Sequence, residues 1–328
     1  MDYKSAGVDI EHGNKVKSNI QNIAKRSIRP EVLGKIGGFG GLFKLDTSKY
    51  KNPVLVSSTD GVGSKLKLAF EYDTHYDVAQ DLVNHCVNDI IVTGAEPLFF
   101  LDYIGMNKLD ENVFNQLIEG FSQACAANNC ALIGGETAQL PDLYKEHEYD
   151  LSGTIVGVVE QDKILDGSTV VEDDVIIGLY SNGLHTNGYT LAQKALSSQL
   201  IDRYINELTE VHTSYYKPFN LCRNYIKAAA HITGGGLIDN IPRTLPLQYR
   251  AVINKSSWKK PHIFKQIQES GNISDEEMYK VFNMGIGMTF IVSKDDAEDC
   301  VEKLNTHCYE STIIGAIKTK NTDSVVLI

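Results

Sequence analysis

Two acidic residues in the first half of the chain follow apolar runs, where a loop can present a side chain to a ligand. Asp60 lies in SSTDGVGSK after the run 53–57, and Glu136 lies in ALIGGET after the run 131–133. Neighbouring glycines remove side-chain bulk and let a ligand approach the backbone. Carboxylates suit hard cations such as Mg²⁺, so both positions are candidates for a metal–phosphate site. An Asp-Gly pair after a strand is also a common turn, so Asp60 alone decides nothing.

A third candidate acid, Asp89, belongs to a predicted helix at 78–92. This helix has one wholly polar face and an apolar opposite face. The polar residues are Asp81, Asn84, His85, Asn88 and Asp89. Solvated helix faces normally carry Lys, Glu, Arg and Gln, whereas these short side chains are poorer helix formers. This choice favours a ligand-facing stripe, and without cysteine it suits Mg²⁺ and phosphate better than zinc. We expect Asp60, Asp89 and Glu136 to converge on one cleft.

Glycine clusters supply candidate phosphate cradles. GGFGG at 37–41 is the densest, and its N–H groups suit a mobile lid over phosphate. In the second half, SNGLHTNG spans 181–188, and TGGG at 233–236 precedes a predicted helix whose N-terminus attracts anions. A flexible linker and ordinary strand-to-helix turns are the alternative interpretations. No Walker A motif and no strand-GxGxxG-helix unit occurs, which argues against an ordinary P-loop protein and a Rossmann dehydrogenase.

Composition restricts the class of protein. The chain has 328 residues, of which 42% are hydrophobic and 22% charged, as expected for a globular protein of two domains. Its net charge of −11, with no basic run, argues against a nucleic-acid binder. No 18-residue apolar run or leader pattern occurs, so we expect a cytoplasmic protein without a membrane partner. Six cysteines without a CxxC pair are interpreted as reduced structural thiols.

The order of elements predicts an α/β (α+β) fold in two different domains. Apolar runs separated by helix-length segments precede a turn-rich stretch at 160–174, after which a new strand begins. We expect domains 1–168 and 169–328. The expected strands are 53–57, 99–104, 131–133, 154–159, 175–180 and 325–328, and the expected helices are 78–92, 111–127, 191–208 and 216–230.

Taken together, these segments resemble the phosphoribosylformylglycinamidine cyclo-ligases, or aminoimidazole ribonucleotide synthetases. The motifs occur in the family's order almost from end to end. They are YKSAGVDIEHGN, GGFGGLF, SSTDGVGSKL, DLVNHCVNDIIVTGAEPLFFLDY, IGGETAQLPDLY, SNGLHTNGY, HITGGGLIDNIPR and NMGIGM.

The resemblance implies an enzyme of de novo purine biosynthesis. It would use ATP and Mg²⁺ to close formylglycinamidine ribonucleotide into aminoimidazole ribonucleotide through an iminophosphate, releasing ADP and phosphate. It further implies an N-terminal ATP-binding and dimerisation domain whose mixed sheet pairs into a barrel across a homodimer. The C-terminal domain would be a three-layer α/β domain that binds the substrate.

The resemblance also implies roles for individual residues. Lys65, Asp89 and His185 would take part in catalysis, with His185 moving a proton during ring closure. The metal would be held by Asp60, Asp89 and Glu136, joined by Asp81. ATP would be bound by Gly37, Gly38, Phe39, Gly40, Gly41, Asp60, Lys65 and Asn88. The substrate, in a cleft between the domains, would meet Asn182, His185, Asn187, Gly234, Gly235 and Gly236.

Two other functions remain open from the sequence. Relatives in the wider superfamily include small-molecule kinases, which give a stable phosphorylated product instead of a ring. A non-catalytic nucleotide-binding regulator would keep the glycine loop, but it would be expected to have lost the acids that this chain retains.

Overall fold

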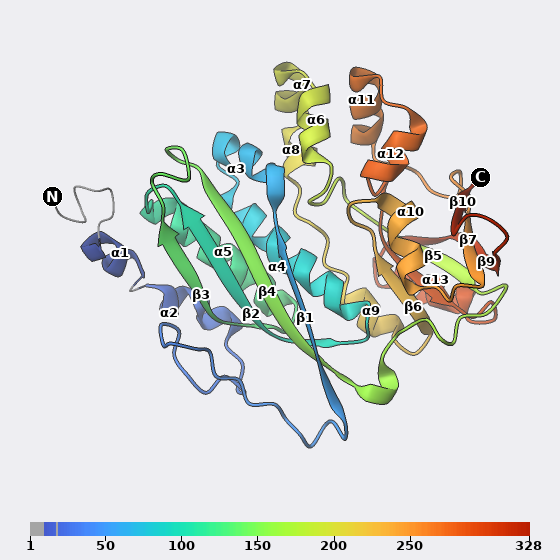
Figure 1. The fold of residues 1–328 in the computed structure, drawn as a ribbon, viewed down its shortest axis with the longest axis horizontal. Coiled ribbons are helices and arrows are strands. Elements are labelled where there is room, and N and C mark those ends of the chain that lie inside the picture. The colour runs from blue at the N-terminus through green and yellow to red at the C-terminus, as the bar shows by residue number, and fades with distance from the viewer. Residues whose placement is uncertain (1–9, 18) are drawn as a thin grey trace. The chain divides into compact units, whose positions relative to one another are not determined.

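Each half of the chain builds a sheet of its own (Figure 1). The computed structural model describes residues 10–17 and 19–328, so residues 3–9 of the first family motif lie outside the described part. One compact unit comprises the described residues up to 90 together with 95–161, and the other comprises 91–94 with 162–328. The domain boundary expected after residue 168 stays a prediction.

The first unit contains a four-stranded mixed sheet in the order β1-β4-β2-β3. Strand β4 pairs antiparallel with β1 and β2, whereas β2 and β3 are parallel and are joined by the crossover helix α5. The strands are β1 (Pro53–Gly61), β2 (Glu96–Met106), β3 (Ala131–Gln139) and β4 (Tyr149–Glu160). Strand β3 is longer than the three apolar residues of its sequence signal, because it continues through the Gly-Gly-Glu segment.

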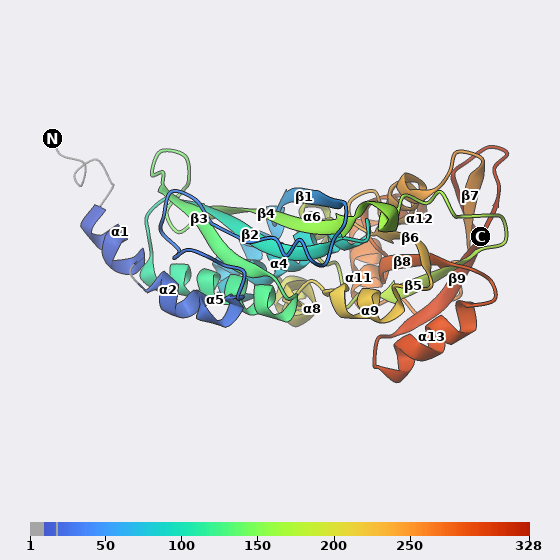
Figure 2. The same ribbon diagram turned by 90° about the horizontal axis from the view of Figure 1, so that it is seen from below.

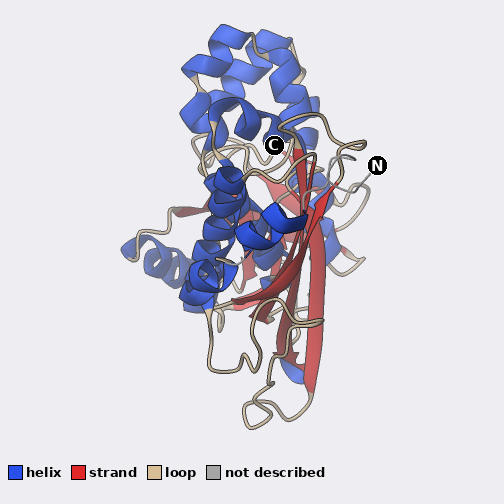
Figure 3. Ribbon diagram, turned by 90° about the vertical axis from the view of Figure 1, so that its left-hand side faces the viewer, coloured by secondary structure: helices blue, strands red, loops and turns tan. Residues whose placement is uncertain are grey.

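Helices α4 (His75–Ile91) and α5 (Glu111–Ala127) lie on one side of this sheet (Figure 3). Leu82, Val83 and Val87 of α4 are completely buried, as the predicted apolar face requires. The smaller helices of this unit are α1 (Ile10–Lys17), α2 (Ile20–Ile23), η1 (Ala24–Ser27), η2 (Gly63–Lys65) and α3 (Leu66–Tyr72). The short helix η3 (Gln161–Lys163) begins at the last residue of this unit and continues into the second.

The second unit contains a six-stranded sheet in the order β10-β7-β9-β5-β8-β6. Only β10 and β7 are parallel; the other neighbours are antiparallel. Every residue of β8 is buried, so both faces of the sheet are covered. The strands are β5 (Val175–Tyr180), β6 (Ile226–His231), β7 (Tyr249–Ile253), β8 (Ile286–Val292), β9 (Ser311–Thr319) and β10 (Val325–Leu327).

The helices of the second unit form two groups. α9 and α13 pack together along the sheet (Figure 2), whereas α6, α11, α10 and α12 contact one another. They are α6 (Tyr189–Ala195), α7 (Ser198–Arg203), α8 (Ile205–Thr209), α9 (Tyr216–Cys222), α10 (Gly236–Asn240), η4 (Ile241–Thr244), α11 (His262–Gly271), α12 (Asp275–Val281) and α13 (Ala297–Thr306). No described helix has the length and apolarity needed to cross a bilayer.

Two predicted helices of this unit are wrong. The segment expected as one helix at 191–208 is divided among α6, α7 and α8. The segment expected at 216–230 ends its helix at Cys222 and continues as strand β6, IKAAAH. Alanines favour a helix in isolation, but pairing with β8 satisfies their backbone groups, and their small side chains fit a buried strand.

Gly120 sets the distance between the two helices that support the first sheet. A Cβ at this position would overlap the carbonyl oxygen of Tyr76 in α4. We expect Gly120→Ala to lower the free energy of unfolding by about 1–3 kcal/mol, although alanine is the better helix former. Urea unfolding checks this against Gly34→Ala, where a Cβ would meet nothing within 4 Å. Equal stability of the two variants would contradict the close approach.

Candidate functional site

Asp60 and Asp89 are joined by a histidine at the end of β1. The Asp60 Oδ2 atom lies 2.7 Å from Nε2 of His85 in α4, and Asp89 Oδ2 lies 3.9 Å from the same nitrogen. Ser58 donates its hydroxyl to Asp89 over 3.1 Å. The His85 side chain is 5% exposed, whereas those of Asp60 and Asp89 are 42% and 26% exposed. The structure therefore brings two of the predicted metal ligands together, with their carboxylates open to solvent.

The charges of this cluster support one another. Burial by itself would raise the pKa of Asp60, but the hydrogen bond and charge of His85 and the Gly61 N–H outweigh it and lower that pKa. Burial would likewise lower the pKa of His85, but the Asp60 hydrogen bond and the charge of Asp89 raise it. The ion pair thus holds Asp60 as a carboxylate, the form that binds a divalent cation.

Lys65 and Asp81 form a buried ion pair. Lys65 Nζ lies 2.7 Å from Asp81 Oδ2, and both side chains are 0% exposed. Asn88 is also buried, and Asn84 accepts a hydrogen bond of 2.8 Å from Asn128 of the turn after α5. The polar face of α4 is thus largely an internal network, with Asp89 at its accessible end. The predicted roles of Lys65 on phosphate and of Asp81 on metal stay predictions, and this placement favours a positioning role for the pair.

A row of residues crosses the first sheet beside this cluster. Asp60 pairs with Gly153, Gly153 with Asp102, and Asp102 with Gly135. Side chains at Gly153 and Gly135 would overlap Phe100 and Asp102, respectively, so these glycines make room for their neighbours. In-register residues point to the same face, so Asp60 and Asp102 lie on the same face two strands apart, roughly 10 Å.

Asp102 is a residue that the motif analysis did not single out. It is buried, and this burial, reinforced by the charge of Glu136, raises the pKa of Asp102 to about 7. The available signal was an acid inside the apolar run LFFLDYIG. Aspartate is almost never fully buried unless it is paired, so an acid inside an apolar run indicates a special environment.

Glu136 is placed differently from the other two acids. It follows Gly135 on β3, so strand alternation directs it to the face opposite Gly135 and Asp102. It is exposed, and its Oε1 accepts the N–H of Thr137 over 2.7 Å. The described arrangement does not bring Glu136 to Asp60 and Asp89, and convergence of all three acids stays a prediction.

The glycine segment 37–41 forms the tip of an exposed loop. A bridge between Val32 and Phe43 closes its base, and Gly37 adopts a positive φ of 101°. A Cβ on Gly37 or Gly40 would meet nothing within 4 Å, and Phe39 is fully exposed. Gly41 instead packs on Ile133 of β3. The loop is thus anchored beside β3 with an open tip, as a lid requires, although its contact with ATP stays a prediction.

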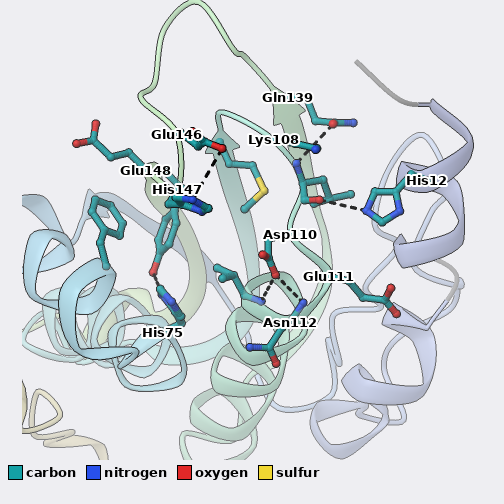
Figure 4. Close-up of a pocket in the computed structure, with 15 residues that line it drawn as sticks. His12, His75, Lys108, Asp110, Glu111, Asn112, Gln139, Glu146, His147 and Glu148 are labelled. Carbon is teal, nitrogen blue, oxygen red and sulfur yellow. Dashed lines mark hydrogen bonds and ion pairs between the residues drawn. The ribbon is translucent and has the colours of Figure 1, made fainter. Parts of the chain in front are cut away.

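The same unit contains a polar cavity of about 880 Å³ (Figure 4). It lies among Met106 of β2, the start of α5 and the segment 146–149. His75 Nδ1 is hydrogen-bonded to the Tyr149 hydroxyl over 2.7 Å, and burial lowers the pKa of His75. Gln139 of β3, which belongs to the IGGETAQLPDLY motif, is one of the residues that line the cavity. None of the predicted metal ligands lines this cavity.

In the second unit, the SNGLHTNG loop is held by an asparagine from the NMGIGM motif. Ser181 donates to Asn283 Oδ1 over 3.0 Å, while Asn283 Nδ2 donates to the Gly183 carbonyl over 2.9 Å. His185 adopts a positive φ of 62°, an unusual conformation for a residue with a side chain. Asn182 is exposed and donates to the Val211 carbonyl over 2.7 Å.

The glycine loop 233–236 is organised by Asn240. Its amide donates to the carbonyls of Gly234 and Gly236 over 3.1 and 2.8 Å, which turns these oxygens inward. The Gly236 N–H bonds to the Thr233 carbonyl, and helix α10 has only five residues. Any anion site here would therefore depend on the N–H groups of Gly234 and Gly235 more than on a helix dipole.

Asn187 lies against this glycine loop. Its Oδ1 would be 3.3 Å from a Cβ on Gly234, and its buried Nδ2 has no hydrogen-bond partner among the described residues. The structure therefore brings Asn187, His185 and the 233–236 loop into one region of the second unit. Their contacts with a substrate stay predictions.

Models of one protein family match both units. The model for AIR synthase related protein, N-terminal domain, matches residues 45–159. The model for AIR synthase related protein, C-terminal domain, matches residues 171–328.

Two relatives match over nearly their full length. The phosphoribosylformylglycinamidine cyclo-ligase of Trichlorobacter lovleyi is 48% identical over 342 residues, covering 99% of this chain and 98% of that protein. The protein of the same name from Thermoanaerobacter pseudethanolicus is 49% identical over 331 residues, covering 97% of each.

Solved structures with this fold are more distant in sequence. Thiamine-monophosphate kinase from Stenotrophomonas maltophilia aligns with a TM-score of 0.70 at 18% identity, covering 94% of this chain and 95% of that one. The hydrogenase maturation protein HypE in complex with ATP aligns with a TM-score of 0.68 at 14% identity, covering 98% and 92%. At these identities the likeness establishes the fold.

The buried Lys65–Asp81 pair generates a stability prediction. Lys65→Met would leave a carboxylate buried without its counter-charge, so we expect unfolding to become easier by about 3–5 kcal/mol. Lys65→Met combined with Asp81→Leu removes both charges and is expected to recover much of this loss. Chemical denaturation measures both, with the exposed Lys67→Met as control. A mild effect of Lys65→Met would show that the pair is not buried in solution.

Asp102 generates a pH prediction. Because its pKa in the folded protein is raised to about 7 from 3.8, it contributes stability below about pH 4 that is lost as the pH rises through 7. Asp102→Asn removes this loss, so its stability relative to the parent is expected to increase by roughly 4 kcal/mol at most between pH 4 and 8. Unfolding without divalent cations, with the exposed Asp150→Asn as control, measures it. Parallel pH profiles for parent and Asp102→Asn would exclude a raised pKa.

Proposed function

Because the chain belongs to the AIR synthase related protein family, we propose that it is an ATP-dependent phosphoribosylformylglycinamidine cyclo-ligase of purine biosynthesis. The observation that carries the proposal is the 48–49% identity to proteins of that name, which extends over both units. The kinase with the same fold is only 18% identical. Phosphorylation of a substrate heteroatom without ring closure is therefore the less supported reading.

The proposed reaction solves the problem of a poor electrophile. A formamide oxygen leaves badly until it carries the γ-phosphoryl group of ATP. The ribose-bearing amidine nitrogen then attacks the formyl carbon, a C–N bond forms, and the C–O bond breaks with its electron pair going to phosphate. The nitrogen loses one proton as the ring forms. Such a reaction depends on positioning, charge neutralisation and removal of this proton.

The residues of the first unit fit a Mg²⁺–ATP site. Asp60 and Asp89 offer two accessible carboxylates, and Mg²⁺ bound to nucleotide is typically held by one or two protein carboxylates. Mg²⁺ would supply neutralisation of the phosphate charge, which a chain of net charge −11 otherwise lacks. His85 orients Asp60, and the Lys65–Asp81 pair fixes η2 against α4. Contacts of Glu136 with the metal and of Asn88 with the nucleotide stay predictions, because Glu136 leaves the sheet on the opposite face and Asn88 is buried.

The glycine loops would bind the phosphate groups of ATP and of the substrate. Gly37, Gly38, Phe39, Gly40 and Gly41 would close over the triphosphate, because the loop tip is open and its root is anchored on β3. In the second unit, the backbone of the 233–236 loop would hold the ribose phosphate of the substrate, and Asn182, His185 and Asn187 would line the substrate site.

The direct test measures both half-reactions in one mixture. The purified chain is incubated with Mg²⁺–ATP and formylglycinamidine ribonucleotide, and the aromatic amine and ADP are quantified. Equal amounts of amine and ADP are expected. ADP without amine would indicate a phosphorylating enzyme with another product, and the absence of both from a folded, ATP-binding chain would indicate a regulator.

Asp89→Asn should lower turnover in this assay by about 10²–10³-fold, because it removes a charge from the metal site. Ser58 can still donate to the amide oxygen, so the fold is expected to remain intact. Glu119→Gln removes one exposed charge from α5 and serves as the control. Near-normal turnover of Asp89→Asn would remove this residue from the proposed site.

A cytoplasmic homodimer completes the proposal. The sheet face opposite α4 and α5 carries Leu55, which is 64% exposed, and the half-exposed Leu101 and Tyr103. An apolar sheet face of this kind is typical of an interface with another protein surface. Pairing of two such sheets into a barrel would bury it.

Leu55→Glu would place a charge on this face, so we expect it to shift the protein from dimer to monomer. Light scattering coupled to gel filtration measures the mass, with Leu247→Glu on the second unit as the exposed control, 90% accessible before substitution. A parent protein that is monomeric at micromolar concentration would refute the dimer.

A further inference from the structure

Three histidines gather beside the proposed substrate loops of the second unit. His185 follows β5, His212 lies between α8 and α9, and His231 ends β6 two residues before the 233–236 loop. They are 2%, 0% and 6% exposed. Buried histidines at such a position are candidates for proton transfer or metal binding.

The contacts among the three rings are specific. His212 Nε2 lies 3.1 Å from His231 Nε2, and His212 Nδ1 lies 3.3 Å from the Thr186 hydroxyl. The rings of His185 and His212 are stacked, with centroids 4.0 Å apart and planes inclined by 17°. Gly287 leaves space for the His185 ring, since a Cβ there would overlap its Cε1 atom.

One nitrogen from each ring lies within 4.8 Å of the others, a spacing that also fits a transition-metal site. The stacking argues against that use. A metal lies in the plane of each imidazole that binds it, and two nearly parallel planes about 4 Å apart cannot both contain one ion. His185 would have to leave its packed position for a three-histidine site to form.

The bond between the two Nε2 atoms has a different consequence. Such a bond needs one nitrogen with a proton and one without, so the tautomers of His212 and His231 are coupled. If a proton binds Nδ1 of His231, its Nε2 proton can pass to His212, whose Nδ1 proton can pass to Thr186. His212 therefore connects His231 to the half-exposed Thr186.

We propose that His231 accepts the proton released in ring closure and that His212 and Thr186 relay it to solvent. This inference rests on the proposed cyclo-ligase function. As the C–N bond forms and phosphate leaves, the N–H bond of the attacking nitrogen breaks and its proton goes to His231 Nδ1. Protons then shift from His231 Nε2 to His212 Nε2 and from His212 Nδ1 to the Thr186 oxygen, and the Thr186 hydroxyl proton goes to water.

His185 has a positioning role in this scheme. Its stacked face holds the His212 ring in the plane that faces His231 and Thr186. No proton passes from His185 to His212 in this scheme, because a stacked face offers His212 no in-plane nitrogen. A direct role of His185 in moving the substrate proton stays a prediction.

The test separates phosphoryl transfer from ring closure in a single turnover of the full-length protein. His212→Gln keeps hydrogen-bonding groups but cannot take a proton at one end and release one at the other. We expect it to form ADP at a rate within threefold of the parent and to form the amine about 10²–10³-fold more slowly. His212→Phe, which keeps a ring for stacking, should behave the same way. His262→Gln, an exposed histidine of α11, is the matched control.

Amine formation by His212→Gln at the parent rate would overturn the relay and leave His212 a packing role. If the parent itself makes no amine, the cyclo-ligase function fails, and the proposed step fails with it. An equivalent of zinc in the purified protein, or a Co²⁺ absorption spectrum that His212→Gln abolishes, would replace the relay by a metal site.

A measurement on the parent protein keeps the inference testable if the variants do not fold. With ¹⁵N-labelled histidine, an N–H···N bond gives a scalar coupling between the two Nε2 nuclei. We expect this coupling between His212 and His231. Its absence in the folded protein would show that the two rings do not share a proton, which would also overturn the relay.

Discussion

The hydrogen-bonded ion pair between Asp60 and His85 is the interaction on which the candidate site depends. It joins the end of β1 to the middle of α4 over 2.7 Å, and it orients a carboxylate that Asp89 and Ser58 flank. Without it, a buried histidine and a half-exposed acid would each lose their main electrostatic partner. The Lys65–Asp81 pair, one turn earlier on α4, fixes the adjoining segment after β1 in the same way. Two ion pairs thus set the register between strand and helix.

Small residues let this arrangement form. Gly153 and Gly135 stand in the same cross-strand row as Asp60 and Asp102, and side chains there would collide with their neighbours. Gly120 plays the corresponding part between α4 and α5. Because these positions lack side chains, the polar groups of α4 can lie close to the sheet. The interior then stays close-packed, as in other folded proteins.

In the second unit, asparagine side chains hold the loops of the candidate substrate site through hydrogen bonds. Asn283 bonds to the loop that carries His185, and Asn240 bonds to the carbonyls of the 233–236 loop. An amide can donate and accept at once, so it satisfies loop backbone groups that no helix or strand pairs. Loops held in this way are pre-organised, which is what positioning of a phosphorylated substrate requires.

The sequence by itself determined the α/β class, the family, the four strands of the first sheet, strands β5 and β10 of the second and the helix α5 at 111–127, because these depend on local pattern and on motif order. Strands β6, β7, β8 and β9 were not predicted. It also singled out Asp60 and Asp89, which the structure brings together at His85, and their metal binding stays a prediction. Only the tertiary structure decided that IKAAAH is a strand, that Lys65 is buried against Asp81, and that Glu136 leaves the sheet on the opposite face from Asp102. The same holds for the meeting of His185, His212 and His231. Each of these features depends on which distant segments of the chain pair and on where the side chains lie in the folded protein. Long-range packing determines both, whereas a sequence pattern contains information only about residues that are near one another in the chain.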